Sequence, residues 1–338
     1  MNTLAPRYLD AIEAELRGVV GAGPSYLAEY YTMLEYHLGW QDGQGNLAPD
    51  SGRGKRIRPL LCLLSCAASG GEWERALPLA AAVELLHNFS LLHDDIQDNS
   101  PLRRGRPTVW TKWGQAQAIN AGDAMFTLAH LAPHALTARG VPAAAALAAL
   151  ECFDRTCLTL TQGQYLDMSF EGRERVSVAE YMTMIEGKTA ALIAAAAQLG
   201  ALIAGAEDER QAHFAEYGRS LGLAFQIQDD LLGIWGDPAV TGKSAASDLE
   251  KRKKSLPVVY SLERSAEFAQ AYARPHRPGE SVVDMAAALE RIGARAYAQQ
   301  QAQALTEKAR QHLEAAAPQG EAGAALREIT SQLLQRNA

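Results

Sequence analysis

The chain has 338 residues, of which 48% are hydrophobic, so it is long enough to bury a sizeable core. Thirty-two lysines and arginines against thirty-nine aspartates and glutamates give a formal net charge of −7. This balance, without a long basic run, excludes nucleic acid as an expected partner. The four cysteines form no CxxC pair and the N-terminus lacks a signal-peptide pattern, which favours a cytoplasmic protein with reduced thiols.

Apolar residues at helical spacing predict two amphipathic helices within residues 7–38, with a break at Gly21–Pro24. A polar loop rich in glycine follows over residues 39–54. Strand patterns are nearly absent from the whole chain, and no phosphate-binding glycine loop or dinucleotide fingerprint occurs. The sequence therefore predicts a protein built from packed helices.

The polar loop leads into Gly54-Lys55-Arg56-Ile57-Arg58-Pro59, and Pro59 can occupy the first turn of the apolar helix predicted over residues 60–68. Lys55 and Arg58 then stand before a helix N-terminus, where unpaired N–H groups and the helix dipole favour anions. Two basic residues before a helix are common, so on its own this pattern is a weak indication of a phosphate site.

Residues 76–98 are predicted to form a helix with one buried apolar face and with Asp94, Asp95 and Asp98 at its C-terminal end. Asp94 and Asp98 share a face, where they repel each other and the negative end of the helix dipole. Oxygen ligands without cysteine suit Mg²⁺, which completes its shell with water and substrate phosphates. The alternative is a solvated acidic helix end that pairs with Arg103 and Arg104.

Further helices are predicted over residues 114–138, 142–170, 178–206 and 207–234. The uncharged stretch Thr189–Ala206 is mostly alanine and glycine, which favours a buried helix over a membrane span. Lys188, just before it, indicates either a functional cavity or a side chain that reaches solvent.

The helix over residues 207–234 carries a second aspartate pair, Asp229 and Asp230, near its end. If this end faced the first pair, the two would hold a metal cluster between them. The long polar segment 237–257 that follows contains Lys243 and Lys253, which would let it close over a phosphate. The alternative is a solvated charged loop.

From about Gly52 to Pro257 these motifs, in this order, resemble those of the trans-isoprenyl diphosphate synthases, also called polyprenyl synthetases. The resemblance implies an all-α fold, a single helical-bundle domain over residues 1–338 around a central cavity (an isoprenoid synthase-like fold), and usually a homodimer. It implies a Mg²⁺-dependent prenyltransferase that condenses isopentenyl diphosphate head-to-tail with an allylic diphosphate and releases diphosphate.

The resemblance also assigns roles to particular residues. The first aspartate motif (Asp94, Asp95 and Asp98) would bind the allylic diphosphate through Mg²⁺, with Arg103 beside it. A basic cluster would hold isopentenyl diphosphate: Lys55, Arg58, His87 and Arg104. The reacting centre would be lined by Lys188, Thr189 and Gln226. Asp229 and Asp230 begin the second aspartate motif, which completes a set of three expected Mg²⁺ ions, and Lys243 and Lys253 would close over the allylic diphosphate.

The chain departs from the family pattern at two positions. Gly233 stands where the second motif usually has its last aspartate, which leaves the third metal with fewer protein ligands; Asp237 lies two turns beyond Asp229 and would help through water. Arg252 stands where the family often has glycine, before Lys253, and adds charge to the loop.

Product length is expected to depend on Phe89 and Ser90 of the helix that carries the first motif. Phe89 lies five residues before Asp94, about 7.5 Å along the helix. In the family a bulky residue there shortens the product, and the first motif lacks the two-residue insertion of the bacterial farnesyl type. This favours a C20 product, with C15 next, while the alternative for Phe89 is ordinary core packing.

Two other functions use similar residues. A class I terpene cyclase also ionises a prenyl diphosphate with aspartates, but it has no second diphosphate for the basic cluster to hold. A non-catalytic subunit of a heteromeric synthase is the other alternative, and the nearly complete first motif argues against it.

Overall fold

The computed structural model describes residues 4–21, 23–47, 54–236, 247–274 and 282–334. This part of the chain is almost entirely helical, which confirms the predicted all-α class. Its backbone forms two compact units. Unit 1 comprises residues 1–152, 199–207 and 319–325, and unit 2 comprises residues 153–198, 208–318 and 326–338. The prediction of a single domain stays a prediction.

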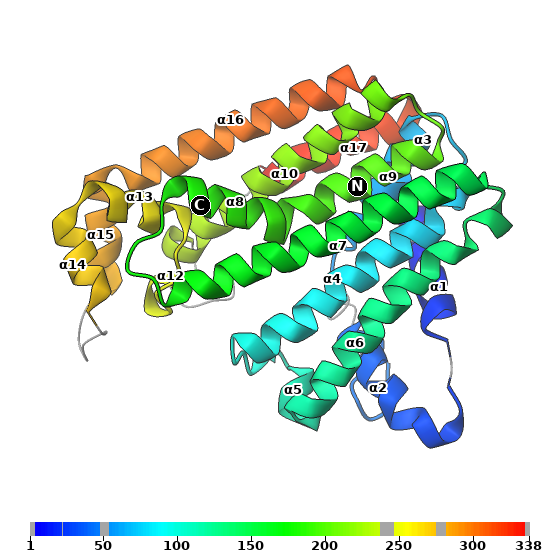
Figure 1. The fold of residues 1–338 in the computed structure, drawn as a ribbon, viewed down its shortest axis with the longest axis horizontal. Coiled ribbons are helices and arrows are strands. Elements are labelled where there is room, and N and C mark those ends of the chain that lie inside the picture. The colour runs from blue at the N-terminus through cyan, green and yellow to red at the C-terminus, as the bar shows by residue number, and fades with distance from the viewer. Residues whose placement is uncertain (1–3, 22, 48–53, 237–246, 275–281, 335–338) are drawn as a thin grey trace. The chain divides into compact units, whose positions relative to one another are not determined.

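Unit 1 is built around α4 (Leu77–Gln97), which lies alongside α6 (Gln115–Leu131) (Figure 1). The other helices of this unit are α1 (Leu4–Val20), α2 (Ala28–His37), α3 (Ile57–Ala68) and α5 (Val109–Trp113), with 3-10 turns η1 (Ser25–Leu27), η3 (Trp73–Ala76), η4 (Ala132–Ala135) and η5 (Thr137–Arg139). Both α1 and α3 pack against α4. Leucines and alanines at helical spacing give α4 its buried face, among them Leu85, Leu86 and Leu92.

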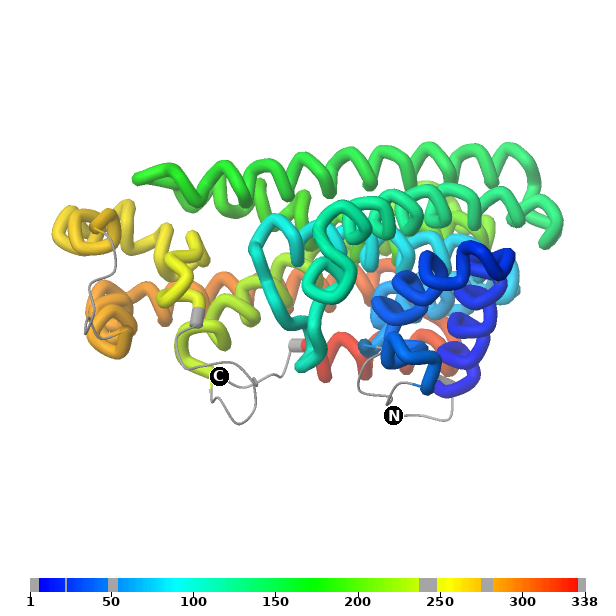
Figure 2. Tube along the Cα trace, turned by 90° about the horizontal axis from the view of Figure 1, so that it is seen from below, coloured from blue at the N-terminus to red at the C-terminus, as the bar shows by residue number. Residues whose placement is uncertain are grey.

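Three helices have residues in both units: α7 (Ala143–Glu171), α9 (Ala191–Ile203) and α17 (Gly320–Leu334). Unit 2 is built around α10 (Asp208–Trp235) and α16 (Ala294–Ala315), which pack along each other. Its shorter elements are α8 (Val178–Ile185), the π-helical segment η6 (Glu186–Ala190), α12 (Ser247–Glu250), α13 (Leu256–Arg264), α14 (Ala266–Ala273) and α15 (Val282–Ile292). Figure 2 shows α13, α14 and α15, in yellow and orange, gathered near one end of α16.

Most predicted helices are confirmed to within a few residues, and the exceptions have physical reasons. The helix predicted from residue 60 begins at Ile57, because proline is tolerated in a first turn whose N–H groups have no partners within the helix. The helix predicted over 178–206 is interrupted by the π-helical turn at Glu186–Ala190. The helix predicted to reach residue 138 leaves α-helical geometry after Leu131.

Two short strands were not predicted: β1 (Leu102–Arg103) pairs with β2 (Arg106–Pro107). The turn between them consists of Arg104 and Gly105, whose φ angles are 53° and 73°. Positive φ at both positions is typical of a type I′ hairpin turn. Within the described residues, no helix combines the length and apolarity that crossing a bilayer requires.

Candidate active site

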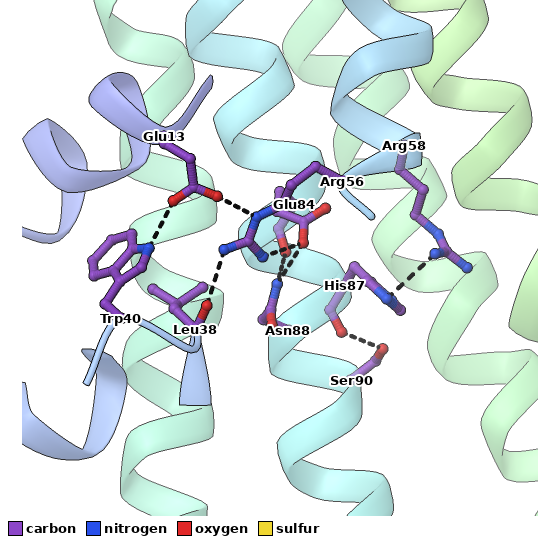
Figure 3. Close-up of polar contacts among 9 residues, drawn as sticks. All are labelled: Glu13, Leu38, Trp40, Arg56, Arg58, Glu84, His87, Asn88 and Ser90. Atoms are coloured by element: carbon purple, nitrogen blue, oxygen red, sulfur yellow. Dashed lines mark hydrogen bonds and ion pairs between the residues drawn. The ribbon is translucent and has the colours of Figure 1, made fainter. Parts of the chain in front are cut away.

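Two members of the basic cluster meet in unit 1, where the first turn of α3 approaches α4. Nη1 of Arg58 lies 3.3 Å from Nε2 of His87 (Figure 3). Because a guanidinium only donates, Nε2 of His87 is the acceptor and the ring is neutral. Burial and the charge of Arg58 hold the pKa of His87 well below its ordinary value, which agrees with this assignment.

Arg104 reaches the same cluster from the hairpin turn. A Cβ atom at Gly54 would lie 2.6 Å from Nη1 of Arg104, so only glycine lets the guanidinium lie against the backbone beside Lys55. Burial lowers the pKa of both Arg58 and Arg104, and each is lowered further by neighbouring guanidinium groups. Cations that are held close together in this way favour an anionic ligand.

The first aspartate motif ends α4 in the same unit, and its three carboxylates differ in burial. Asp98 is exposed, Asp94 is partly buried, and Asp95 is 2% exposed. Nε of Arg103 donates to Oδ1 of Asp95 at 2.8 Å. Burial raises the pKa of Asp95 to about 6, although Arg103 opposes the shift.

A small cavity of about 30 Å³ lies beside this motif in unit 1. Its lining includes Asp95, Arg103, Arg104, Asn88 and His37. Oδ2 of Asp95 and Nε2 of His37 are buried and have no hydrogen-bond partner within the described chain. Burial, helped by the nearby arginines, lowers the pKa of His37 to about 3, so this ring is neutral. Sequence reasoning missed His37, since a single histidine in a helix carries no pattern.

Unit 2 contains the residues that the resemblance assigns to the reacting centre. Nζ of Lys188 lies 2.5 Å from Oδ2 of Asp167 on α7. Lys188 is in the π-helical turn, where Gly187 and Gly163 of α7 bring the two backbones within van der Waals contact. Such turns are rare and frequently occur at functional sites.

The side chain of Thr189 begins a chain of hydrogen bonds. Its hydroxyl donates to Oε1 of Gln226 at 2.9 Å, and Nε2 of Gln226 donates to Oδ1 of Asp230 at 3.1 Å. The other oxygen of Asp230 accepts from the hydroxyl of Tyr181 at 2.5 Å and from the backbone N–H of Leu256 at 2.8 Å. Asp230 is 6% exposed, and burial raises its pKa to about 7, while Asp229 is partly buried.

Asp248 on α12 was not singled out from the sequence. The carboxylate of Asp248 lies where a side chain at position 233 would begin, so a Cβ at Gly233 would overlap Oδ2 of Asp248. A carboxylate is thus present beside the position where the second motif lacks its last aspartate. No sequence spacing indicates this, because the two residues meet only through the fold.

The loop after α12 also accounts for the second departure from the family pattern. Arg252 has φ of 53°, a left-handed conformation that favours glycine. Its Nη1 donates to the carbonyl of Tyr272 at 2.5 Å, which offsets part of the strain. Lys253 is exposed. Lys243 and Asp237 lie outside the described residues.

The side chains fit Mg²⁺ better than a softer metal. Among the described residues no three histidine, cysteine or acidic side chains converge as a ready-made metal cluster. Mg²⁺ does not need one, because it keeps several waters and takes one or two carboxylates together with substrate phosphates. Asp94, Asp98 and Asp229 offer carboxylate oxygens near helix ends, and carboxylates suit Mg²⁺.

Phe89 and Ser90 lie on α4, and both are partly buried. The ring of Phe89 packs against Phe126 of α6, with ring centroids 5.0 Å apart, and against His93 at 4.7 Å. The hydroxyl of Ser90 donates to the carbonyl of His87 at 2.8 Å (Figure 3). Phe89 is therefore part of an aromatic contact between two helices, and its expected effect on product length stays a prediction.

Each unit thus brings together part of the predicted site. Unit 1 holds the basic cluster, Arg103 and the first aspartate motif, and unit 2 holds Lys188, Thr189, Gln226 and the second aspartate motif. That the two aspartate pairs face one another across a cavity stays a prediction.

Known proteins resemble the chain over most of its length. The family described as Polyprenyl synthetase matches residues 50–292. A geranylgeranyl diphosphate synthase of Mycobacterium tuberculosis is 45% identical over 265 residues, which are 77% of this chain and 74% of that protein. A (2E,6E)-farnesyl diphosphate synthase of Mycobacterium bovis is 47% identical over 230 residues, which are 68% of this chain and 62% of that protein. A polyprenyl synthetase from Streptomyces coelicolor A3(2) has a similar crystal structure, with a TM-score of 0.84 at 37% identity, over 97% of this chain and 98% of that one.

Proposed function

Since the chain belongs to the polyprenyl synthetase family, we propose that it condenses isopentenyl diphosphate with an allylic diphosphate to make a short all-trans prenyl diphosphate, C20 in preference to C15. The activity class is that of a trans-prenyltransferase. One observation supports the two-substrate reaction most directly: unit 1 contains a cluster of basic residues as well as an aspartate motif, and so has separate groups for a second diphosphate.

The basic cluster would hold isopentenyl diphosphate. Arg58 and Arg104 would bind its oxygens as planar forks, Lys55 would add a point charge, and His87 would fix the orientation of Arg58. Holding the second substrate in one orientation places its double bond for attack, which makes the reaction effectively unimolecular.

Arg103 would act at the other diphosphate. Its ion pair with Asp95 fixes the guanidinium near the end of α4, where it would neutralise charge as the allylic C–O bond breaks. The family uses Mg²⁺, and we propose that three ions bind here. Held by Asp94, Asp98 and Asp229, they would supply further positive charge to that leaving group. Asp95 and Asp230 would support this metal site by fixing the side chains around it.

Unit 2 would contribute the remaining groups. Lys188, Lys243 and Lys253 would bind the allylic diphosphate, and Thr189 and Gln226 would line the reacting centre next to the developing cation. Loss of a proton then gives the lengthened allylic product, and the released diphosphate is the base that we expect to accept it. No side chain has to act as a nucleophile.

We propose two further properties. The enzyme would be a homodimer, as is usual in the family, and α7 exposes apolar side chains that a second copy would cover, including Leu147, Leu158 and Tyr165. It would work in the cytoplasm, because all four cysteines are free thiols. Light scattering on the protein as it elutes from a size-exclusion column would give its oligomeric state.

The function is tested by incubating purified protein with isopentenyl diphosphate, one allylic diphosphate and Mg²⁺, and sizing the products. We expect chains lengthened by five carbons per step, up to C20. Release of diphosphate from the allylic substrate alone, with a cyclic hydrocarbon as product, would instead indicate a terpene cyclase. No turnover with any primer would indicate a non-catalytic subunit.

A further inference from the structure

Arg56 lies between Lys55 and Arg58 in the sequence but does not share their environment. Its side chain is 3% exposed, and its guanidinium contacts three groups (Figure 3). Nε donates to Oε1 of Glu13 at 2.7 Å, Nη1 to Oε1 of Glu84 at 2.7 Å, and Nη2 to the carbonyl of Leu38 at 3.0 Å. A group enclosed by the protein in this way has no surface for a substrate.

The two carboxylates around Arg56 are held in turn. Trp40 donates to Oε2 of Glu13 at 2.7 Å, and Nδ2 of Asn88 donates to Oε1 of Glu84 at 3.0 Å. Although burial acts to lower it, the pKa of Arg56 is raised above its ordinary value by Glu84 and Glu13. Arg56 therefore joins α1, the end of α2, the start of α3 and α4 through charge-assisted hydrogen bonds.

The positions of these contacts relate Arg56 to the basic cluster. Arg56 precedes α3 and has φ of 48°, a left-handed conformation unusual for arginine. Its partner Glu84 lies one turn before His87 on α4. Arg56–Glu84 and Arg58–His87 are thus two successive links between the start of α3 and the same helix.

The two links differ in strength. Arg56 and Glu84 are both charged and buried, at 2.7 Å, whereas Arg58 contacts a neutral ring at 3.3 Å. The contact between Arg58 and His87 therefore depends on the distance at which the Arg56–Glu84 ion pair holds the start of α3 from α4. Displacing the start of α3 would also move Gly54 away from the guanidinium of Arg104.

We propose that Arg56 is a positioning residue for the isopentenyl diphosphate site: through Glu84 and Glu13 it fixes the start of α3, so that Lys55, Arg58, His87 and Arg104 converge on one diphosphate. This proposal rests on the proposed function of the basic cluster. It predicts a selective effect, because Arg56 touches neither the first aspartate motif nor Arg103 through any hydrogen bond that it makes.

The first test is Arg56→Lys, which keeps the charge but cannot make three bonds in one plane. We expect the dissociation constant for isopentenyl diphosphate, measured by titration calorimetry without a second substrate, to rise about tenfold or more, because small displacements of binding groups have large effects. The dissociation constant for farnesyl diphosphate with Mg²⁺ should change by less than about twofold. In turnover, the KM for isopentenyl diphosphate should rise more than kcat falls.

A second variant keeps the test valid if removing one charge impairs folding. Breaking a buried pair leaves an uncompensated charge, whereas replacing both partners by apolar groups of similar volume is often tolerated. Arg56→Met with Glu84→Met should therefore melt near the wild-type temperature, because the remaining carboxylate, Glu13, is 20% exposed and keeps its bond from Trp40. It should still bind isopentenyl diphosphate about tenfold more weakly, because apolar contact does not fix an angle as a guanidinium fork does.

The matched control is Arg139→Met. It breaks the ion pair between Arg139 and Glu15, and Glu15 lies on α1, as Glu13 does. It should leave both dissociation constants unchanged. Arg58→Ala tests the basic cluster itself and should weaken isopentenyl diphosphate binding strongly.

The outcomes separate the two proposals. If Arg58→Ala weakens binding while both Arg56 variants bind isopentenyl diphosphate like the wild type, the role given to Arg56 is wrong and the proposed function stands. Equal weakening of both substrates would also overturn it, because that indicates general damage. If Arg58→Ala binds normally, the basic cluster is not the site, and both proposals fail.

Discussion

The ends of α4 and α10 each carry a pair of adjacent aspartates, but the hydrogen-bond partners of the second aspartate differ between the two. In both pairs the first aspartate is partly buried and the second is fully buried. Asp95 is held by the cation Arg103, which is 31% exposed, and one of its oxygens has no partner in the described chain. Asp230 accepts hydrogen bonds on both oxygens from three neutral donors.

This difference separates a charge that can respond to a ligand from one that serves as a structural tie. The Arg103 side chain is 31% exposed, so its terminal nitrogens can contact a substrate anion while its Nε keeps the bond to Asp95. Tyr181 and Leu256 are buried, and without Asp230 their donor groups would have no acceptor among the described residues. We infer that Asp230 fixes Gln226 and the start of α13, and that metal binding at the second pair falls to Asp229.

The largest expected effect comes from removing the first member of each pair. Asp94→Ala and Asp229→Ala should each lower kcat by about 10³-fold or more, because each would remove a carboxylate that holds the Mg²⁺ ions, and these ions would neutralise the leaving diphosphate. Melting temperatures should change little, because neither residue is fully buried. Assays with labelled isopentenyl diphosphate would measure the turnover rate of both variants. A rate near that of the wild type in either variant would contradict the assignment.

Removing the second member tests the comparison through stability. Asp230→Ala leaves the hydroxyl of Tyr181 and the N–H of Leu256 buried without an acceptor, which should cost about 3 kcal/mol of unfolding free energy. Asp95→Ala should cost only about 1 kcal/mol, because Arg103 can turn to water. Urea unfolding of both variants at one pH measures the difference. Equal losses would show that the two pairs are held in the same way.

Acid titration distinguishes the surroundings of the first pair. Burial lowers the pKa of His37 to about 3. Between pH 6.5 and 3, His37 is therefore protonated in the unfolded chain but stays neutral in the folded chain. The contribution of neutral His37 to the free energy of unfolding is fully present above pH 6.5 and decreases as the pH falls. At pH 5 the loss from this group should be about 2 kcal/mol. His37→Phe should reduce the loss between pH 7.5 and pH 5 measured by urea unfolding, and an unchanged loss would exclude His37 as its source.

Regular spacing made most of the fold predictable from the sequence. Apolar residues at helical intervals predicted α4 and α10, and the four-residue separation of Asp94 and Asp98 placed both on one face. The resemblance named the members of the basic cluster, and the structure brings Arg58 to His87 and Arg104 to the loop that carries Lys55.

What could not be predicted depends on contacts between distant segments. The π-helical turn lies where Gly163 meets Gly187, and the spacing within one helix does not indicate it. The burial of Asp230 depends on Tyr181, and the carboxylate of Asp248 reaches Gly233 only through the fold. Arg56 is buried whereas its neighbours Lys55 and Arg58 are not, and the sequence pattern does not indicate this difference.

The smallest expected effect is a change in product length, and it again separates the two helices. Five residues before the first aspartate, α4 has Phe89 and α10 has the buried Ala224, so α4 alone offers a bulky side chain at that depth. Phe89→Ala should shift products beyond C20 with kcat within about tenfold of the wild type, because no binding group is removed. Phe126→Ala should cause a smaller shift, since it removes only the ring that supports Phe89 at 5.0 Å. Chromatography of the dephosphorylated products measures both. If product lengths are unchanged in both variants, Phe89 is an ordinary packing residue and chain length is determined elsewhere.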